Sequence, residues 1–572
     1  MEISVQRYLL HHYSMFEKFP IWVRDVIVKV AKRLFHEEEI NDFLEKNQNK
    51  DTHSFIESIL DYFHIATGLT KQELDYIPSY GRVVVVANHP LGALDALSLL
   101  HLLSDVRKDV KIVANSFLSH FEPLKDILIP VDNIHGKIDK DSLKYIYEAL
   151  QKEQAVIIFP SGEVSRARPT GIKDTQWKSG FFKIASKMHA PILPVFIDAK
   201  NSRNFYLFSL FNRTLATATL PHEMFKSQHK HIDFTIGKPI PYDSYSRVNL
   251  LPKESVKLLR KHFYRIAKGG KEIFKTHNEI SMPESRIELK KGLKEGQLLG
   301  DTFDGKQIIL YESSVENVVL KEIGRLREIS FRFVGEGSGK KRDIDSFDLY
   351  YKHLVIWDDE ALEIAGAYRI GVCKEIVESF GIKGLYTSRI FEYKDPFDIY
   401  IKQGIELGRS FVQPKYWNTR ALDYLWQGIG AFVRQKPQIR YLFGAVSISD
   451  AFSLQAKSMI VYFYTHYFGT KSDAVKHRYK YQMPTSMQEY CKSIFAGDNY
   501  KLDIKTLKDE LALRGFTIPT LYKQYSEACD EGGVVFYDFG YDSEFNNCID
   551  GFICVDLHLL KPSKRERYIG VA

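Results

Sequence analysis

The stretch VVVVANHPLGALD, residues 83–95, decides the fold of the first half of the chain. Its opening residues, Val83–Ala87, form an unbroken apolar run rich in β-branched side chains, which is typical of a buried strand. His89 and Asp95 then bracket a turn that contains a proline and a glycine, two residues that preset or permit unusual backbone angles. The pattern predicts a strand that leads into a loop carrying a base and a carboxylate that orients it.

A second stretch, FPSGEVSR at residues 159–166, again follows an apolar run and again places polar groups at the end of a predicted strand. An alcohol is a poor nucleophile at neutral pH, so its attack on a thioester needs a neutral imidazole and a carboxylate that fixes the tautomer. His89 and Asp95 fill these two roles if the turn folds back on itself. On the first motif alone, a helix-capping aspartate and an exposed histidine are the better interpretation. The second stretch shifts the preference to a base and its orienting carboxylate.

Apolar strand-like runs alternate with helical segments from residue 79 to residue 248. This alternation predicts an α/β domain with a mainly parallel sheet. Before it, residues 1–78 carry apolar side chains at three-to-four spacing, which predicts a helical N-terminal region. The predicted strands are 83–87, 110–114, 155–159, 191–197 and 232–236, and the predicted helices include 140–153 and 177–188.

The composition indicates several folded domains in a reducing compartment. A chain of 572 residues is expected to hold about two to four domains, and its 44% hydrophobic content supports packed cores. Its five cysteines lie far apart without a Cys-x-x-Cys pair, so we expect no disulfide framework and no metal site. The start MEISVQR lacks a basic segment followed by an apolar one, and no window of about 18 uncharged apolar residues occurs. Neither a secretory signal nor a membrane-spanning helix is therefore expected.

The net charge of +7 suits an anionic membrane surface or an acidic protein partner, although such an excess also occurs on proteins that bind neither. No nucleic-acid partner is expected. The expected location is the cytoplasm, with peripheral contact on the inner face of the cell membrane.

Residues 249–306 are predicted to form a basic amphipathic helical linker. Residues 252–277 hold eight Lys or Arg side chains, while apolar residues recur on one helical face. Such a helix either lies on a membrane interface or packs its apolar stripe on the first domain. The nearby segment FYLFSLF, residues 205–211, is unusually aromatic for a loop and is either a membrane-dipping wedge, a wall for an acyl chain or simply buried.

Three elements in the right order resemble those of a known family: Asn88-His89 with Asp95, then FPSGE at 159–163, then PILPV at 191–195. The glycerolipid acyltransferase superfamily carries an Asn-His-x4-Asp element, a Phe-Pro-Glu-Gly-Thr-like element and a later proline-containing strand. The resemblance implies the α/β fold of that superfamily, with His89 as general base and Asp95 as its orienting carboxylate. It further implies that the acceptor is contacted by Asn88, Gly162, Glu163 and Arg166.

Two departures from the superfamily pattern limit the range of acceptors that the first domain is expected to use. Five residues rather than four separate His89 from Asp95, a spacing associated with the branch that acylates lyso-aminolipids and is often labelled hemolysin. The block that supplies an arginine for glycerol phosphate in other members reads IPVDN at residues 129–133. A phosphate is best held by a fixed guanidinium, so this difference argues against a glycerol-phosphate acceptor. Basic side chains that could serve a carboxylate instead are Arg166, Arg168 and Lys178.

In the second half, charged residues recur at the ends of predicted helices and strands. Read by themselves they are surface ion pairs. Their order resembles the acyl-carrier-protein-dependent N-acyltransferases, a GNAT-like group that includes acyl-homoserine lactone synthases and ornithine N-acyltransferases. The resemblance implies an α+β, autoinducer-synthase-like domain over residues 307–572. The residues that carry it are Arg327, Asp345-x2-Asp348, Arg369 and Glu406-x2-Arg409.

By this resemblance, Glu406 receives the amine proton directly or through water, and backbone N–H groups on a bulged central strand stabilise the oxyanion. The acyl donor is a phosphopantetheine thioester on acyl carrier protein, and no cofactor is bound. Because that carrier is acidic, the basic loop at residues 340–342 is a candidate for its docking, or else an ordinary solvated loop. The residues implied to hold the amino-acid acceptor or shape its site are Asp345, Asp348, Arg369 and Arg409.

The whole chain resembles the bifunctional ornithine lipid synthases. This implies that the C-terminal domain transfers a 3-hydroxyacyl group to the α-amine of ornithine, and that the N-terminal domain acylates the 3-hydroxyl of that lyso-lipid. Glycine, serine or another amino acid could replace ornithine. Two different functions also stay open: a glycerophospholipid acyltransferase with a non-catalytic accessory domain, and a non-catalytic membrane-binding protein.

Overall fold

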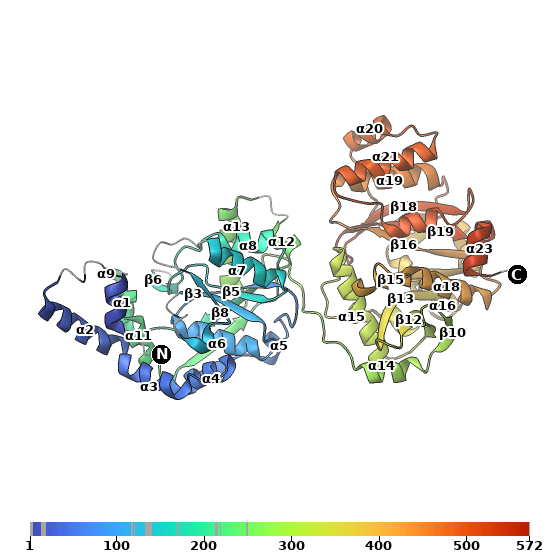
Figure 1. Ribbon diagram of the computed structural model, residues 1–572. Helices are drawn as coiled ribbons and strands as arrows, with labels where there is room; N and C mark the ends of the chain where they lie inside the picture. The colour runs from blue at the N-terminus through green and yellow to red at the C-terminus, as the bar shows by residue number, and fades with distance from the viewer. Residues whose placement is uncertain are drawn as a thin grey trace. The chain divides into compact units, whose positions relative to one another are not determined.

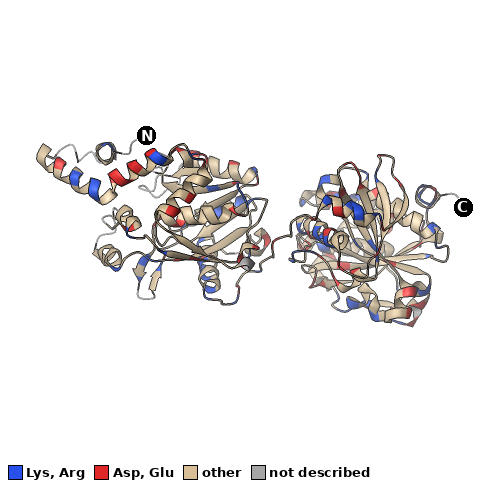
Figure 2. Ribbon diagram, turned by 90° about the horizontal axis from the view of Figure 1, so that it is seen from below, with Lys and Arg blue, Asp and Glu red and all other residues tan. Residues whose placement is uncertain are grey.

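The chain folds into two compact units, Met1–Glu279 and Ile280–Ala572 (Figure 1). The computed structural model describes residues 4–12, 16, 19–115, 118, 121–131, 140–168, 171–211, 216–217, 219–246 and 250–570. The last two residues of the IPVDN block, 132 and 133, lie outside the described residues. In the described ranges, no helix has the length and apolar character needed to cross a bilayer. Basic and acidic residues are interspersed over the ribbons of both units (Figure 2).

The first unit begins with helices and continues into a seven-stranded sheet of order β1-β9-β8-β2-β5-β3-β4. Neighbouring strands are parallel except for β8 and β9. The predicted α/β fold with a mainly parallel sheet is confirmed.

The helices of the first unit are α1 (Val5–His12), α2 (Ile21–Phe35), α3 (Glu37–Asn47), α4 (Thr52–Tyr62), α5 (Lys71–Leu74), α6 (Ala93–Ser104), α7 (Lys140–Gln151), α8 (Gly180–Lys187), α9 (Arg203–Phe211), α11 (Leu220–Phe225), α12 (Tyr242–Ser246) and α13 (Pro252–Ile266). Its strands are β1 (Ala66–Gly68), β2 (Val83–Ala87), β3 (Val110–Asn115), β4 (Leu128–Val131), β5 (Ala155–Ile158), β6 (Arg166–Arg168), β7 (Gly171–Lys173), β8 (Ile192–Asp198) and β9 (His231–Ile236), with β6 and β7 forming a separate hairpin.

Strand β2 lies between β5 and β8, and both of its faces are covered by helices. Val84 and Val86 belong to the core that includes residues of α7, α8 and α13, whereas Val83, Val85 and Ala87 belong to the core that includes residues of α4 and α6. Figure 1 shows these two groups of helices on opposite sides of the sheet. Burial on both faces explains why the strand is an unbroken apolar run.

Helix α13 packs on the first unit through its apolar stripe. Val256, Leu259 and Phe263 are all buried in the core shared with α8, and the Phe263 ring lies 5.0 Å from the ring of Trp177. The basic helix therefore uses its apolar face for the core, which leaves only its cationic face exposed. The segment expected to be a linker over residues 249–306 is instead divided between the two units, because α14 contributes Leu289 and Leu293 to a core of the second unit.

The aromatic segment at residues 205–211 is a helix, α9, rather than a loop. Phe205 and Tyr206 are buried in a small cluster with Val164 and Ala216. The other side of the helix is exposed, and its apolar side chains there are Leu207, Phe208, Leu210 and Phe211.

The second unit is built on an eight-stranded sheet of order β10-β11-β12-β13-β15-β16-β19-β18. All neighbouring strands are antiparallel except β15 and β16. Helix α15 packs on one face, and α18 and α19 pack on the other, so the predicted α+β fold is confirmed. Its helices are α14 (Arg286–Leu293), α15 (Val318–Phe333), α16 (Cys373–Phe380), α17 (Asp398–Lys402), α18 (Ala421–Arg434), α19 (Leu454–Phe468), α20 (Thr485–Ile494), α21 (Tyr500–Leu513), α22 (Thr520–Ser526) and α23 (Pro562–Tyr568), with short 3₁₀ turns η4 (Ser346–Leu349) and η6 (Tyr386–Arg389). Its strands are β10 (Gln297–Asp301), β11 (Gln307–Tyr311), β12 (Lys352–Asp358), β13 (Glu363–Val372), β14 (Phe391–Tyr393), β15 (Gly404–Val412), β16 (Tyr441–Ile448), β17 (Val475–His477), β18 (Val534–Asp542) and β19 (Cys548–Asp556).

Truncating Phe263 tests whether α13 is part of the first unit. Phe263→Ala is expected to lower the free energy of unfolding of that unit by about 3–5 kcal/mol, because it removes a buried aromatic side chain and leaves a cavity. Urea unfolding followed by hydrogen exchange in α8 and α13 measures the change. Lys261→Ala, on the exposed face of the same helix, is the control and should stay within about 0.5 kcal/mol of the wild type. Equally small effects of the two substitutions would show that α13 does not pack on the sheet.

Candidate active sites

The turn after β2 folds back so that His89 meets Asp95. Nδ1 of His89 lies 3.2 Å from Oδ2 of Asp95, whose side chain is fully buried. The same oxygen accepts hydrogen bonds from the backbone N–H groups of Leu91 (2.7 Å) and Gly92 (3.0 Å). Gly92 has a φ of +99°, a backbone conformation that residues with a Cβ rarely adopt. The carboxylate thus closes the turn and faces Nδ1 of the imidazole, so Nε2 is the ring nitrogen left to take a proton.

The FPSGEVSR loop lies directly against this turn. The backbone N–H of Ser165 donates to the carbonyl of His89 at 2.7 Å, and the ring of Phe159 stacks on the imidazole at 4.2 Å between centroids. The imidazole itself is 21% exposed, so it stays open to a substrate. The two sequence motifs therefore form one site at the carboxyl ends of β2 and β5.

Other predicted residues surround this pair. The side chain of Asn88 is paired with the backbone of Ile197, to which it donates at 2.9 Å and from which it accepts at 2.7 Å, so it ties β2 to β8. The Arg166 guanidinium is buried, donates to Thr217 at 2.9 Å and lies 3.7 Å from Glu163. A Cβ at Gly162 would lie 3.1 Å from Nζ of Lys178, and Gly162 has a φ of +67°. Contact of these residues with the acceptor stays a prediction.

Asp174 is a residue of this site that the motifs did not identify. Its buried carboxylate accepts hydrogen bonds from Oγ of Ser165 (2.6 Å), the backbone N–H of His89 (3.2 Å) and Nε1 of Trp177 (3.0 Å). Burial raises the pKa of Asp174, while the hydrogen bonds from Ser165 and His89 act in the opposite direction. The carboxylate joins the His89 turn and the FPSGEVSR loop through one group. The Asp-x2-Trp spacing was the available signal, because a buried indole N–H needs an acceptor.

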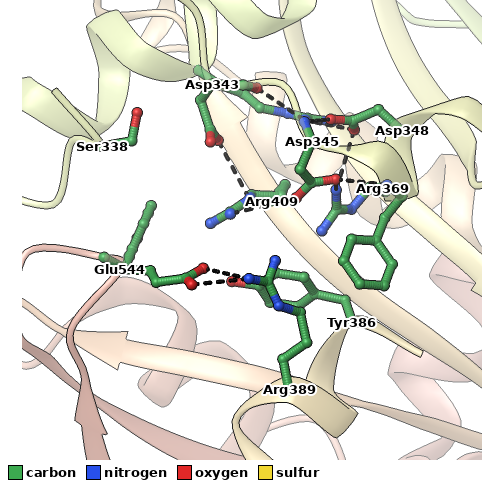
Figure 3. A network of polar contacts seen from close by, with 12 residues as sticks. Ser338, Asp343, Asp345, Asp348, Arg369, Tyr386, Arg389, Arg409 and Glu544 are labelled. Carbon is green, nitrogen blue, oxygen red and sulfur yellow. Dashed lines mark hydrogen bonds and ion pairs between the residues drawn. The ribbon is translucent and has the colours of Figure 1, made fainter. Parts of the chain in front are cut away.

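In the second unit, arginines and aspartates from four different segments meet (Figure 3). Asp348 receives Nη1 of Arg327 at 2.8 Å and Nη1 of Arg369 at 3.2 Å, and Arg369 also donates to Asp345 at 2.6 Å. Burial by itself raises the pKa of Asp348, but the two guanidinium groups hold it well below its usual range. The three residues predicted on this side of the site are therefore brought together, and Arg327 completes the group.

Arg409 joins the same cluster because the strand that carries it is bulged. The register between β13 and β15 shifts between Ala367 and Arg369, and Arg409 has a φ of +52°. Its guanidinium lies 3.3 Å from Asp343 and 3.6 Å from Asp345. A bulge re-aims a side chain, and a left-handed non-glycine residue costs on the order of 1–3 kcal/mol and is typical of functional sites. The predicted bulged central strand is present, and oxyanion stabilisation by its N–H groups stays a prediction.

Strands β15 and β16 stop pairing beside this bulge. They are in register only from Gly404 opposite Tyr441 to Glu406 opposite Phe443, although both strands continue for several residues. At the point of divergence the backbones are close, since a Cβ at Gly444 would lie 2.1 Å from the carbonyl oxygen of Leu407. Beyond it, the two strands no longer pair with each other.

Glu406 is buried under a turn rather than open to the cluster. Its carboxylate accepts from the backbone N–H groups of Tyr386 (3.0 Å) and Thr387 (2.6 Å), and from the hydroxyl groups of Thr387 and Tyr351. The anchored Tyr386 ring lies 4.9 Å from the guanidinium carbons of both Arg369 and Arg409. Glu406 thus positions the tyrosine whose ring packs against both arginines, and its role as proton acceptor stays a prediction.

Two further features of this site were not predicted. Asp343 is buried beside Arg409; burial raises its pKa, and the charge of Arg409 lowers it. It lies two residues before Asp345, so the spacing Asp-x-Asp-x2-Asp was the available signal. At the exposed side of the cluster, Arg389 pairs with Glu544 at 2.9 Å (Figure 3).

Comparison with known proteins agrees with these two sites. The family described as Acyltransferase matches residues 15–270, and the Acetyltransferase (GNAT) domain matches residues 326–427. A glycine N(alpha)-acyltransferase of Phocaeicola vulgatus is 34% identical over 310 residues, which cover 51% of this chain and 92% of that protein. The chain belongs to the aminolipid acyltransferases. The resemblance predicted from the motifs, to a bifunctional enzyme with an O-acyltransferase-like and a GNAT-like domain, is confirmed.

Two further relatives of this aminolipid acyltransferase are similar over shorter stretches. A lyso-glycine lipid O-acyltransferase of Phocaeicola vulgatus is 29% identical over 228 residues, covering 39% of this chain and 81% of that protein. An L-ornithine N(alpha)-acyltransferase of Rhizobium meliloti is 33% identical over 128 residues, covering 21% of this chain and 42% of that protein. A solved CoA-dependent acyl-homoserine lactone synthase matches 25% of this chain and 67% of its own at 17% identity and a TM-score of 0.18, a likeness too low to carry an argument.

Substituting Asp174 tests its role in positioning His89. Asp174→Asn keeps the size of the side chain but replaces one acceptor oxygen by a donor that cannot serve all three partners. We expect the kcat for O-acylation of a lyso-aminolipid to fall about 100-fold with a small change in KM, because the imidazole is displaced. Asp198→Asn, an exposed aspartate at the end of β8, is the control. An unchanged kcat in a variant that unfolds at the wild-type temperature would exclude the positioning role.

The Arg409 guanidinium is tested by a charge-conserving change. Arg409→Lys keeps the charge but loses the planar fork, so we expect the KM for the amino acid in N-acylation to rise about 10–100-fold. Arg389→Lys, at the exposed rim, should change it less than about threefold. Steady-state kinetics with a saturating acyl donor measure both variants, and equal KM values for wild type and Arg409→Lys would contradict the assignment.

Proposed function

We propose that this chain makes an aminolipid by two successive acyl transfers. The second unit transfers a 3-hydroxyacyl group from the thioester of an acyl carrier protein to the α-amine of a small amino acid. The first unit then esterifies the 3-hydroxyl of that product with a second acyl group. The observation that carries the proposal is that one chain holds both an imidazole 3.2 Å from a buried carboxylate and a buried cluster of arginines and aspartates.

The cluster in the second unit is chemically suited to a zwitterion. Within the described part of the chain, five of its buried polar atoms make no hydrogen bond: Nε of Arg327, Nη2 of Arg369, Nε of Arg409, Oδ2 of Asp343 and Oδ2 of Asp345. Of these, Nε of Arg409 and Oδ2 of Asp343 form an ion pair at 3.3 Å. A buried polar atom that makes no hydrogen bond marks a place where water or a ligand can bind. Guanidinium N–H groups suit an α-carboxylate and carboxylate oxygens suit an α-ammonium, so a free amino acid matches both kinds of atom.

The N-acylation proceeds by attack of the amine on the thioester carbonyl. The extended donor lies in the opening where β15 and β16 diverge, which brings its carbonyl beside the bulge at Arg409. The carbon–nitrogen bond forms, the carbon–sulfur bond breaks and the thiol leaves. Before the attack, the bound α-ammonium gives one proton to a carboxylate of the cluster or, through water, to Glu406, which frees the nitrogen lone pair. A second proton from the nitrogen passes to the leaving thiolate. Backbone N–H groups of the bulged strand stabilise the oxyanion.

The O-acylation uses His89 as the base. Its Nε2 takes the proton of the 3-hydroxyl as the oxygen attacks the second thioester, and it returns a proton to the leaving thiol. Asp95 holds the imidazole tautomer and stabilises the charged form. The lyso-aminolipid keeps a free carboxylate, for which the buried Arg166 guanidinium is a suitable partner. Joining the two units in one chain raises the effective concentration of the intermediate at the second enzyme.

Glycine is the favoured acceptor. Two glycine N(alpha)-acyltransferases, of Phocaeicola vulgatus and Bacteroides thetaiotaomicron, are matched over 92% and 82% of their lengths, whereas the ornithine enzyme of Rhizobium meliloti is matched over 42%. Greater coverage at similar identity supports glycine as the amino acid of this chain.

Ornithine is the second candidate, and a group of acidic residues favours it. The carboxyl group of Asp550 lies within electrostatic range of Asp542, Glu336 and Arg409. Burial raises the pKa of Asp550 to about 8, with a further increase from the charge of Asp542, and burial raises the pKa of Glu336 to about 7. The side-chain ammonium group of ornithine would favour the ionised forms of Asp550 and Glu336.

The proposal is tested by lipid analysis in a host that makes no aminolipids. Expression of the wild-type chain is expected to yield a diacylated amino-acid lipid, and isotope-labelled glycine or ornithine fed to the cells identifies the amino acid by its mass shift. His89→Ala should accumulate the mono-acylated intermediate, because N-acylation does not use the imidazole. Asp198→Asn serves as the control and should match the wild type.

Two results would contradict this assignment. A host that makes the protein yet contains no new amino-acid lipid would remove the proposed function. Undiminished diacyl product from His89→Ala would remove the O-acylation step from the first unit.

A further inference from the structure

A basic groove of about 440 Å³ lies on the surface of the first unit, beside helix α13. Its lining includes Tyr264 and no carboxylate among the described residues. Its cationic side chains are Lys173, Lys257, Arg260, Lys261, Arg265 and Lys268. Apart from Arg260, which binds a backbone carbonyl, none of these cations makes a hydrogen bond or ion pair within the described part of the chain. An unneutralised concentration of positive charge of this kind attracts an anionic partner.

The groove is connected directly to the catalytic histidine of the same unit. Nη2 of Arg260 donates to the backbone carbonyl of Asp174 at 2.9 Å, and the hydroxyl of Tyr264 accepts from the backbone N–H of Asp174 at 3.1 Å. The side chain of Asp174 in turn holds the backbone of His89. A partner bound in the groove therefore lies next to the loop that carries the site of acyl transfer.

We propose that the basic groove on α13 is the docking surface for an acidic acyl carrier protein that delivers the second acyl group to His89. This inference rests on the proposed O-acylation and names the partner of that step. The acidic surface of a carrier complements a groove lined by cations, and its thioester arm then reaches the neighbouring active site. The basic loop at residues 340–342 fits this task less well, because Arg342 is already paired with Glu284 at 2.6 Å.

An anionic membrane is a poorer match for the groove than a protein. A helix that binds at a membrane interface inserts an apolar face, whereas the apolar stripe of α13 is buried in the core. Most of the exposed large apolar side chains of this unit lie on α2 and α9, which Figure 1 shows at one end of the unit and away from α13. Leu250 and Leu251 are exposed just before the start of α13, but neither lines the groove. The groove therefore offers charge without apolar anchors.

Charge reversal in the groove tests the proposal in the full-length protein. The groove variant carries Lys257→Glu, Lys261→Glu and Lys268→Glu, and the control carries the same change in net charge at lysines outside the groove, Lys140→Glu, Lys183→Glu and Lys253→Glu. The donors compared are hexadecanoyl thioesters of acyl carrier protein, of CoA and of pantetheine, with a supplied lyso-aminolipid so that only O-acylation is followed. We expect the groove variant to raise the KM for the carrier-protein donor on the order of 10-fold or more, with kcat conserved. The KM for the pantetheine donor should stay within twofold, and the control should behave as the wild type.

Several results would overturn the proposal. An equal rise in KM for the CoA and carrier-protein donors would show that the groove recognises phosphate groups rather than a protein. An unchanged KM for all donors, or a loss of binding to phosphatidylserine vesicles without a change for the carrier, would exclude carrier docking. If the wild type acylates no lyso-aminolipid from any donor, the proposed function fails. Surface plasmon resonance with the carrier protein alone then tests whether the carrier binds in the groove. Equal binding of the carrier protein by the wild type and the groove variant would exclude docking in the groove.

Discussion

Both active sites depend on one constraint, which is that a buried carboxylate must be hydrogen-bonded or paired with a cation. In the first unit, Asp95 and Asp174 both bind the segment that carries His89, and their acceptor atoms close the turn and join it to the FPSGEVSR loop. In the second unit, Asp348 holds Arg327 and Arg369 together. The geometry of each site therefore follows from the partners that its buried acids require.

The second unit adds backbone strain and strand divergence to this constraint. Arg409 reaches the aspartate cluster only because its strand is bulged and its own φ is positive. The same region is where β15 and β16 stop pairing, so the divergence of the two central strands and the charged cluster lie beside each other. A regular strand at this position would direct the guanidinium elsewhere.

Helix α13 shows how one element serves packing and recognition at once. Its apolar stripe completes the core beneath β2, and the opposite face gathers the cations of the basic groove. Because Arg260 and Tyr264 of this helix also bind the backbone of Asp174, its packing helps to fix the residue that accepts a hydrogen bond from the backbone of His89. The contacts of α13 therefore contribute both to the stability of the first unit and to the geometry of its candidate site.

The sequence by itself determined the two fold classes, most of the central strands and the pair His89 and Asp95, because strand periodicity and the residues at a strand end are local features. The order of four further residues along the chain, through its resemblance to the N-acyltransferases, identified Asp345, Asp348, Arg369 and Arg409 as candidates. Only the tertiary structure decided that Asp174, Asp343 and Tyr386 belong to the sites, that Glu406 is buried under a turn, and that the expected linker is divided between two cores. The physical reason is that a buried polar group finds its partner across the fold. A partner that is distant in the sequence, such as His89 for Asp174, cannot be read from local residue spacing, and neither can the bulge that turns Arg409 inward.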